Sequence, residues 1–232
     1  MKLNNLLLKA VENNIDWCDA VAKSHNLITV RTDSLWYCTE AMPTYYPNAI
    51  TRHDRALNNS LINDLLAPIA KPWAIKDSFN NVNHADSRLI SLFSAHWYGY
   101  QPQNARPLAF DFPPLEFVNT LADIAIWIEA WGETPNNNAV FNEKLLKASP
   151  TSLVYLTEFG QVTCGAALYA SQGVVGISNF FGSIEEQQRL IRTIQMSYPN
   201  ETIVGYGDEA ELTLLKPFGF IELGKLNVLQ AN

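Results

Sequence analysis

The sequence of 232 residues is poor in cysteine and histidine, and the few that occur are scattered. The three cysteines, Cys18, Cys38 and Cys164, are an odd number at wide spacing, so they match neither a disulfide framework nor a zinc motif. The four histidines also lack the spacing of metal ligands. We therefore expect no metal site and a protein of a reducing compartment, with the cytoplasm as the default.

Long apolar runs and blocks of positive charge are also missing. No window approaches the roughly 20 apolar residues of a membrane-spanning helix, and the short run Leu6-Leu7-Leu8 does not make a signal peptide. The 16 basic residues are outnumbered by 23 acidic ones, for a net charge of -7, so we expect no nucleic acid partner. The sequence has neither Gly-x-Ser-x-Gly nor Gly-x-x-x-x-Gly-Lys, the signals of a serine hydrolase and a P-loop.

The composition, 47% hydrophobic and 17% charged, is sufficient for a complete core. In the first 70 residues, apolar spacing predicts a helix over 3–11, and Asp16 is a candidate N-cap for a second helix over 17–25 that ends at Asn26. A turn-rich segment follows, with short strands over 35–38 and 49–51 and a helix over 57–66.

From residue 73 the pattern alternates between strands and helices. Strands are predicted over 73–78, 89–98 and 115–118. Thr120-Leu121-Ala122-Asp123 is close to a capping box, with Asp in place of Glu, and begins a helix that runs to about Trp131. The spacing predicts a core-facing side made of Leu121, Ile124, Ile128 and Trp131.

Residues 153–197 organise the chain. Two strands joined by a turn at Glu158-Phe159-Gly160 are followed by a third strand over 174–179, a loop over 180–183 and a helix over 184–197. A strand that leads through a Gly-containing loop into a helix is a generic seat for an anion, because the first N–H groups and the helix dipole favour negative charge. Most such units bind nothing, so a purely structural role stays open.

The rest of the chain predicts a strand over 202–206, a helix over 209–215 and a last strand over 221–229. Its segment Leu214-Leu215-Lys216-Pro217-Phe218-Gly219-Phe220 resembles the terminal motif Leu-Tyr-x-x-x-Gly-Phe of the GNAT superfamily of N-acetyltransferases. Residues 175–179 and 204–208, with 17–21 and 45–51, resemble a poorly characterised bacterial branch of it. The resemblance covers nearly the whole chain and is specific for fold from about residue 73.

This resemblance implies an α/β (α+β) fold, in which helices flank a mixed, twisted sheet. Residues 71–232 would form the acetyltransferase domain, and 1–70 a helical and turn-rich N-terminal extension packed on it. Acetyl-CoA would lie in a V-shaped split between the strands over 174–179 and 202–206.

The same resemblance implies which residues would hold acetyl-CoA. The pantetheine arm would pair with the backbone of the first strand, at Ile177, Ser178 and Asn179. The pyrophosphate would meet the following loop, at Phe181, Gly182 and Ser183. Gly182 has no Cβ and would let the backbone come close to the phosphates.

The chain departs from the superfamily's pattern at two places. The phosphate motif Arg/Gln-x-x-Gly-x-Gly/Ala is replaced by Asn179-Phe180-Phe181-Gly182-Ser183-Ile184, with Ile184 where a small residue is usual. Glu185 and Glu186 follow; they complement the helix dipole and also repel a pyrophosphate. The usual tyrosine general acid falls on Leu215.

Asp208, Glu209 and Glu158 are possible bases, and Asp208 and Tyr206 are the preferred candidates for catalysis. Asp208, at the mouth of the expected split, could take the proton of an amine, and Tyr206 could replace the missing phenol. The alternatives are that Asp208 caps the next helix and that Tyr206 packs against its neighbours. The resulting hypothesis is an acetyl-CoA-dependent N-acetyltransferase acting on a small-molecule amine; its alternative is a non-catalytic GNAT-like fold that binds CoA or a partner.

Overall fold

A computed structural model of the chain describes residues 3–55, 62, 64, 67, 72–82, 89–102, 113–132, 140–148 and 150–231. The helix expected over 57–66 lies almost entirely outside these residues. The helices are α1 (Leu3–Ser24), α3 (Leu121–Ala130), α4 (Glu143–Lys147), α5 (Ile184–Ser197), α6 (Glu209–Leu215) and the 3-10 turn η1 (Lys216–Phe218). The strands are β1 (Thr29–Arg31), β2 (Leu35–Cys38), β3 (Ala49–Thr51), β4 (Trp73–Asp77), β5 (Leu89–Tyr100), β6 (Glu116–Phe117), β7 (Thr151–Glu158), β8 (Gln161–Ser171), β9 (Val174–Phe181), β10 (Ile203–Gly207) and β11 (Ile221–Ala231).

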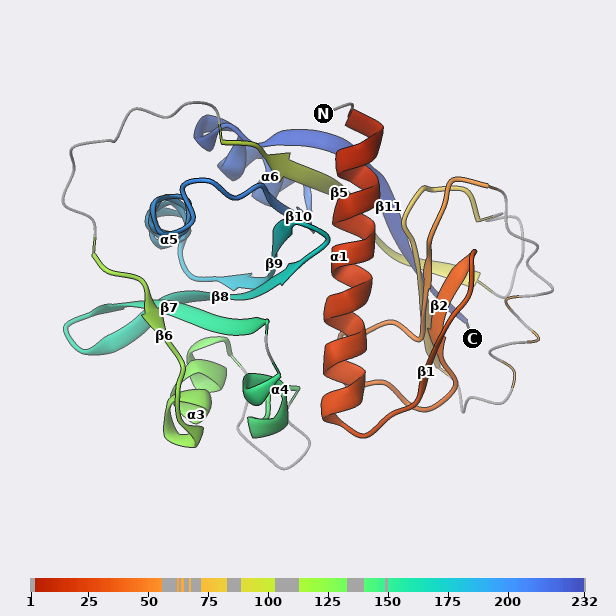
Figure 1. Ribbon diagram of the computed structural model, residues 1–232, viewed down its shortest axis with the longest axis horizontal. Helices are drawn as coiled ribbons and strands as arrows, with labels where there is room; N and C mark the ends of the chain where they lie inside the picture. The colour runs from red at the N-terminus through yellow and green to blue at the C-terminus, as the bar shows by residue number, and fades with distance from the viewer. Residues whose placement is uncertain are drawn as a thin grey trace.

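All of these strands belong to one mixed, twisted sheet, in the order β1-β2-β3-β4-β11-β5-β10-β9-β8-β7-β6. Helices α1, α3 and α4 pack on one face, and α5 and α6 pack on the other. Figure 1 shows α1 crossing the middle of the sheet. Helix α5 lies against β8 and β9 on the opposite face. The mixed sheet with flanking helices confirms the predicted fold class. None of the helices within the described ranges is long and apolar enough to cross a membrane.

Helix α1 is continuous, where the sequence indicated two shorter helices. Asp16, expected as the N-cap of the second helix, lies within α1 and pairs with Arg31 at 2.6 Å. Neither Gly nor Pro interrupts residues 3–24, and one apolar side continues past residue 16 onto the sheet, so nothing forces a break. Helix α1 ends at Ser24, and Asn26, which was predicted as its C-cap, follows with the left-handed φ of 62° typical of residues that close a helix.

Strands β9 and β10 are parallel neighbours whose pairing ends at Gly205 and Ile177. Beyond this point β10 continues along β5 as far as Gly207, and β9 continues along β8 as far as Phe181. The two strands therefore part while each keeps its outer partner. This confirms the prediction that they are neighbours that separate at their C-terminal ends.

The start of α3 also follows the sequence. The Thr120 side chain accepts from the backbone N–H of Asp123, whose carboxylate accepts from the Thr120 N–H at 2.9 Å, which completes the capping box. The expectation that Leu121 faces the core is wrong, since it is 59% exposed. At about 100° per residue the buried side is centred between Ile124 and Trp127, which leaves Leu121 at its edge.

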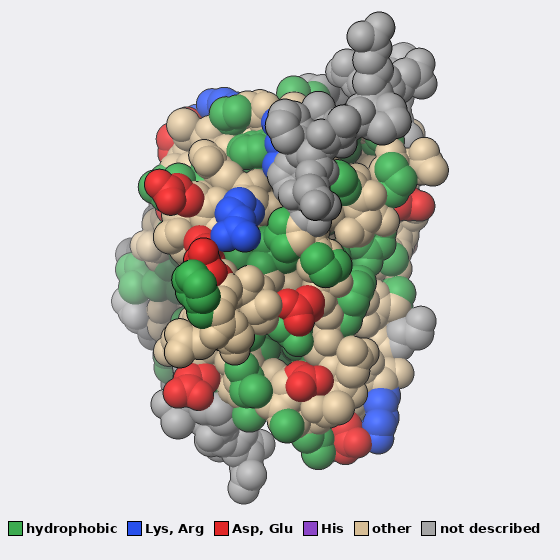
Figure 2. All heavy atoms as spheres, turned by 90° about the vertical axis from the view of Figure 1, so that its left-hand side faces the viewer, with side chains coloured by type: hydrophobic (Ala, Val, Ile, Leu, Met, Phe, Trp, Pro, Cys, Tyr) green, Lys and Arg blue, Asp and Glu red, His purple; other side chains and the backbone are tan. Residues whose placement is uncertain are grey.

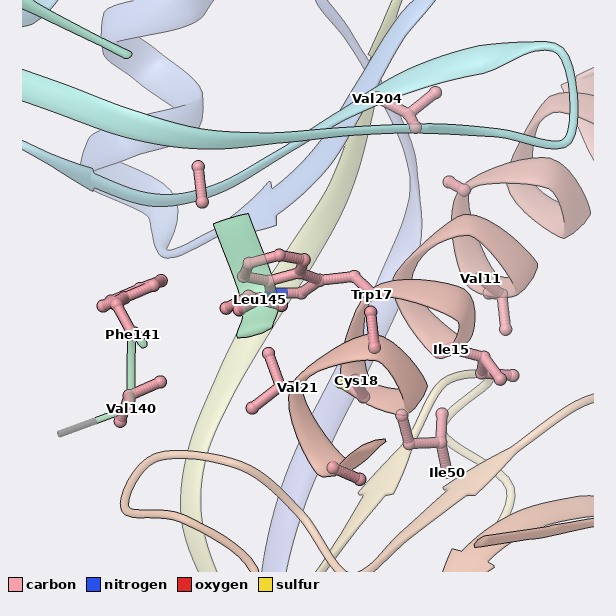
Figure 3. Close-up of a cluster of buried hydrophobic side chains, with 14 of the residues drawn as sticks. Val11, Ile15, Trp17, Cys18, Val21, Ile50, Val140, Phe141, Leu145 and Val204 are labelled. Atoms are coloured by element: carbon pink, nitrogen blue, oxygen red, sulfur yellow. The ribbon is translucent and has the colours of Figure 1, made fainter. Parts of the chain in front are cut away.

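The first 70 residues meet the rest of the chain through aromatic packing and through the sheet. Trp17 of α1 stacks on Phe141 at 6.3 Å between ring centroids and tilts against Tyr169 at 5.8 Å. Figure 3 shows Trp17 projecting from α1 toward Leu145 and Phe141. Strand β3 pairs in parallel with β4, which extends the sheet to β1. The division into domains at residue 70 stays a prediction.

Candidate active site

A cavity of about 250 Å³ lies where β9 and β10 separate. Its walls come from α1, the turn before β3, β4, β5, β9, β10 and α6. The lining residues are Asn14, Trp17, Cys18, Tyr45, Tyr46, Pro47, Lys76, Tyr98, Ile177, Ser178, Asn179, Phe180, Tyr206, Gly207 and Glu211.

The alternating sequence of β10 explains why groups from both faces of the sheet reach this cavity. Successive strand residues point to opposite faces. Gly205 and Gly207 face α6, and a Cβ at these positions would lie 2.6 Å from the Tyr98 hydroxyl and 2.6 Å from Glu211 Oε1, respectively. The two glycines thus leave the space that Tyr98 and Glu211 occupy. Tyr206 lies between them and faces α1, with its ring 5.3 Å from that of Trp97.

Glu211 and Tyr98 form a hydrogen-bonded pair on the α6 side. The Tyr98 hydroxyl donates to Glu211 Oε1 at 2.7 Å. Burial raises the pKa of Glu211 from its ordinary 4.5 to about 7; the Tyr98 hydrogen bond lowers it, and the charge of Asp208 raises it. Burial also raises the pKa of Tyr98 well above 10. Such a carboxylate can accept a proton near neutral pH, while the tyrosine stays protonated and holds it in place.

On the opposite side, Lys76 brings a buried positive charge to the cavity. Lys76 is 2% exposed, and its Nζ donates to Asn14 Oδ1 at 2.7 Å. The same Nζ lies 3.9 Å from the centroid of the Tyr206 ring. The aromatic face and the amide oxygen orient the ammonium group at the cavity wall.

The thiols offer no nucleophile here. Burial raises the pKa of Cys18, at the cavity wall, to about 11, although the charge of Lys76 lowers it. Burial likewise raises the pKa of Cys164 to about 11. Within the described ranges, no three His, Cys, Asp or Glu side chains are grouped as a metal would require.

The end of β9 is tied to the turn that precedes β3. Asn179 has a left-handed φ of 52°, and its Oδ1 accepts from the Tyr46 hydroxyl at 3.1 Å. Burial raises the pKa of Tyr46 well above 10, so it stays a donor. The pair fixes the strand end at which β9 leaves β10.

The loop after β9 leads into α5 as predicted, and Gly182 in this loop lies close to β8. Its φ is 124°, and a Cβ there would lie 2.5 Å from Cys164 Cβ. The missing side chain therefore permits close contact with β8, and the expected approach of Gly182 to a phosphate stays a prediction. Ser183 caps α5 by accepting from the Glu186 N–H at 3.3 Å.

The two phenylalanines before α5 pack on opposite sides of the sheet, Phe180 against the buried cluster on the α5 side and Phe181 against the other. Phe181 packs edge-on against Trp127 of α3, with ring centroids 5.0 Å apart, on the face of the sheet away from α5. Ile184 is 68% exposed. In the first turn Glu185 is exposed, whereas the Glu186 side chain is 14% exposed and pairs with Arg189 at 3.3 Å. Figure 2 views the side of the molecule that carries α5; acidic and basic side chains are interspersed there.

Seven residues named from the sequence lie at or beside the cavity. Ile177, Ser178, Asn179 and Tyr206 line it, and Phe181, Gly182 and Ser183 follow at the end of β9 and before α5. Asp208 does not line it: its carboxylate is exposed and accepts from the Glu211 N–H at 2.8 Å, so Asp208 is the N-cap of α6, as the alternative had it. Leu215, at the position of the missing tyrosine, is 1% exposed in the core.

Sequence reasoning missed the residues that bring chemistry from elsewhere in the chain. They are Asn14, Cys18, Lys76, Tyr98 and Glu211. Only Glu211 had a local signal, because it lies one helical turn after Asp208 and the cap of α6 turns it toward the strand split. The others approach from α1, β4 and β5, which no local pattern places at β10.

Comparison with known proteins identifies the fold. No family model and no curated protein matches the sequence. Among solved structures, a GCN5-related N-acetyltransferase from Kribbella flavida has a TM-score of 0.60 at 9% identity, over 94% of this chain and 95% of that one. A putative acetyltransferase of the GNAT family from Novosphingobium aromaticivorans has a TM-score of 0.57 at 12% identity, over 96% and 97%. A putative acetyltransferase from Pyrococcus horikoshii has a TM-score of 0.51 at 10% identity, over 99% of this chain and 85% of that one.

The protein therefore has the fold of the GNAT N-acetyltransferases. The resemblance read from the terminal motif is confirmed at the level of fold, and it extends over the first 70 residues. At 9–12% identity these matches establish the architecture alone.

Proposed function

We propose that the protein is an acetyl-CoA-dependent N-acetyltransferase that acts on a small amine. The observation that carries the proposal is the Glu211–Tyr98 pair in the cavity where β9 and β10 separate. A carboxyl group whose pKa lies at about 7 is suited to take a proton from an amine at neutral pH. The fold supports the choice of reaction, because its solved neighbours include proteins described as N-acetyltransferases.

Two features of the split support acetyl-CoA as the acetyl donor. Past Ile177 the edge of β9 that faces β10 has no strand partner among the described residues, so the backbone of Ser178 and Asn179 can pair with an extended amide chain. The start of α5 supplies N–H groups and the positive end of a 14-residue helix for the pyrophosphate. The proposed cofactor contacts are therefore Ile177, Ser178, Asn179, Phe181, Gly182 and Ser183, with the last three acting through their backbone.

Acetyl-CoA supplies an acetyl group that is already activated as a thioester, so the protein has to orient the amine and move protons. Glu211 accepts a proton from the amine as the N–C bond forms and the C–S bond breaks. Tyr206 faces the other side of the cavity and is our candidate donor of the proton to the departing sulfur. Asp208 is assigned a supporting part: it caps α6 and its charge raises the pKa of Glu211.

Calorimetric titration with CoA and an assay of CoA release from acetyl-CoA with a panel of small amines test this proposal. We expect CoA to bind, and we expect release that depends on the amine and falls strongly in Glu211→Gln. Glu209→Gln is the matched control, because Glu209 is in the same helix with its side chain 67% exposed. A folded protein that binds no CoA would refute the proposal.

A non-catalytic CoA-binding protein is the second candidate function. It is favoured by Leu215, which offers no phenol, and by Glu185, which places negative charge where a pyrophosphate would lie. CoA binding without amine-dependent release in the same assays would select this alternative.

A further inference from the structure

The cavity contains a buried positive charge that the proposed reaction does not use. An ammonium group has three N–H donors. Among the described residues, Lys76 Nζ meets one hydrogen-bond acceptor, Asn14 Oδ1, and the ring of Tyr206, and no carboxylate lies within ion-pair distance of it. The next residue, Asp77, is turned to other partners and accepts from the Val82 N–H at 2.9 Å. Because buried charges are normally paired, Lys76 is positioned to receive an anion from a ligand.

We propose that Lys76 binds the carboxylate of the acceptor, so that the substrate is an α-amino acid with an apolar side chain; this inference rests on the acetyltransferase function proposed above. Lys76 and Glu211 reach the same cavity of about 250 Å³ from opposite faces of the sheet. An α-amino acid carries its amine and its carboxylate on one carbon. Its amine meets Glu211 while its carboxylate pairs with Lys76, and a simple alkylamine leaves Lys76 without a counter-ion.

A second cavity adjoins the first and accounts for the side chain of the acceptor. It has a volume of about 680 Å³ and shares Tyr45, Tyr46, Pro47, Lys76 and Tyr206 with the first. Beyond these shared residues its wall is largely apolar and includes Met42, Trp73, Leu92, Phe93 and Val228. A substrate whose carboxylate lies at Lys76 can place an apolar side chain there, which favours residues such as leucine, methionine or phenylalanine.

Matched acceptors in the presence of acetyl-CoA test the assignment. Each of these three amino acids is compared with its amide, which lacks the negative charge, and phenylalanine also with phenethylamine, which lacks the carboxylate. We expect kcat/KM to favour the acids in the wild type, and we expect Lys76→Gln to reduce that acid-to-amide ratio by about 10- to 100-fold, as the loss of a charge-assisted hydrogen bond implies. The change in the ratio cancels differences in amine reactivity. Lys225→Gln, at an exposed lysine of β11, should leave the ratio unchanged.

Calorimetric binding of the same amino acids and amides, with CoA present, gives a second measurement that needs no turnover. Acids that bind more tightly than amides in the wild type, and not in Lys76→Gln, support the inference. If Lys76→Gln does not fold, the wild-type comparison decides alone. The Lys76 inference is overturned if the protein binds CoA but binds and acetylates acids and amides equally well. It is also overturned if the protein binds CoA and none of the acids. Both results leave the proposed function standing. Failure to bind CoA overturns the proposed function itself.

Discussion

Replacing Glu211 with Gln should remove the part of the pH dependence of acetyl transfer near neutrality that comes from this carboxyl group. Burial raises the pKa of this carboxyl from 4.5 to about 7, against the hydrogen bond from Tyr98 and with the help of the charge on Asp208. A base with this pKa is half ionised at neutral pH, so the contribution of Glu211 to wild-type kcat/KM should rise through pH 7 and then level off. Gln keeps the shape and an oxygen for the Tyr98 hydroxyl, but it cannot take a proton.

The expected loss is that of a general base. Such groups contribute about 10²- to 10⁴-fold to rate, so the variant should lose activity on this scale at pH 8 while it binds CoA as the wild type does. Any pH dependence that remains in Glu211→Gln belongs to the amine. The difference between the two profiles therefore isolates Glu211.

The same pKa difference predicts that Glu211 makes the folded protein less stable as the pH rises. The carboxyl ionises at about 4.5 in the unfolded chain and at about 7 in the folded protein, so the folded state binds more protons between these values. The stabilisation is present in full below pH 4.5 and is lost as the pH rises through 7. Ionising the buried group costs about 3 kcal/mol, so the stability of Glu211→Gln relative to wild type should increase by up to this amount between pH 4.5 and pH 8. For a chain of this size that corresponds to roughly 6–12 °C in Tm.

Thermal unfolding and kcat/KM, each measured from pH 5 to pH 9 for wild type, Glu211→Gln and Glu209→Gln, test both expectations. Glu209→Gln should follow the wild type in the relative pH dependence of kcat/KM. The role of Glu211 as the base is refuted if wild-type activity follows a pKa near 4.5. It is also refuted if kcat/KM of Glu211→Gln changes slope near pH 7 as the wild type does. A stability difference between wild type and Glu211→Gln that does not change with pH would show that burial does not raise the pKa.

Three further substitutions test the surroundings of the site. Tyr98→Phe removes a hydrogen bond that lowers the pKa of Glu211, so the rise of kcat/KM near pH 7 should move to higher pH. An unchanged pH profile would contradict the hydrogen bond between Tyr98 and Glu211. Gly182→Ala should cost about 1–3 kcal/mol in denaturant unfolding, because φ is 124° and the new Cβ meets Cys164, and wild-type stability would count against this packing. Glu185→Lys should raise CoA affinity about 3- to 10-fold at low salt, with less effect at high salt; calorimetry that shows no gain would place the pyrophosphate elsewhere.

The elements that sequence reasoning placed correctly are those with local physical causes. The predicted helix over 184–197 has the same bounds as α5, because Ser183 caps it and apolar residues recur at helical spacing. Asn26 closes α1 and Asp208 begins α6 for reasons contained in two or three residues. The break predicted at Asp16 is absent from the structure. A good N-cap residue does not start a new helix where the apolar side of an existing helix continues through it.

The candidate site was only half visible from the sequence, because its other half depends on contacts distant along the chain. The positions of Ile177, Ser178 and Asn179 could be predicted, because they end the strand that leads into the loop before α5. In the sequence, Lys76 is a single charged residue in a short predicted strand. No neighbouring residue indicates that α1 and β10 bury it. The positive φ of Gly182 and its contact with β8 could not be predicted either, because neither can be read from a single glycine in the sequence.

The segment Val204-Gly205-Tyr206-Gly207 shows how one strand can build a site with two chemically different sides. Its alternation sends Tyr206 toward Lys76 on the α1 face, while the two glycines admit Tyr98 and Glu211 on the α6 face. The sheet thus separates a buried cation from a buried carboxylate, which would otherwise pair and neutralise each other. The end of the β9–β10 ladder at Gly205 then opens a passage between the two sides. A ligand that carries both an amine and a carboxylate is complementary to this arrangement, and this connects the strand split, the raised pKa of Glu211 and the proposed acceptor.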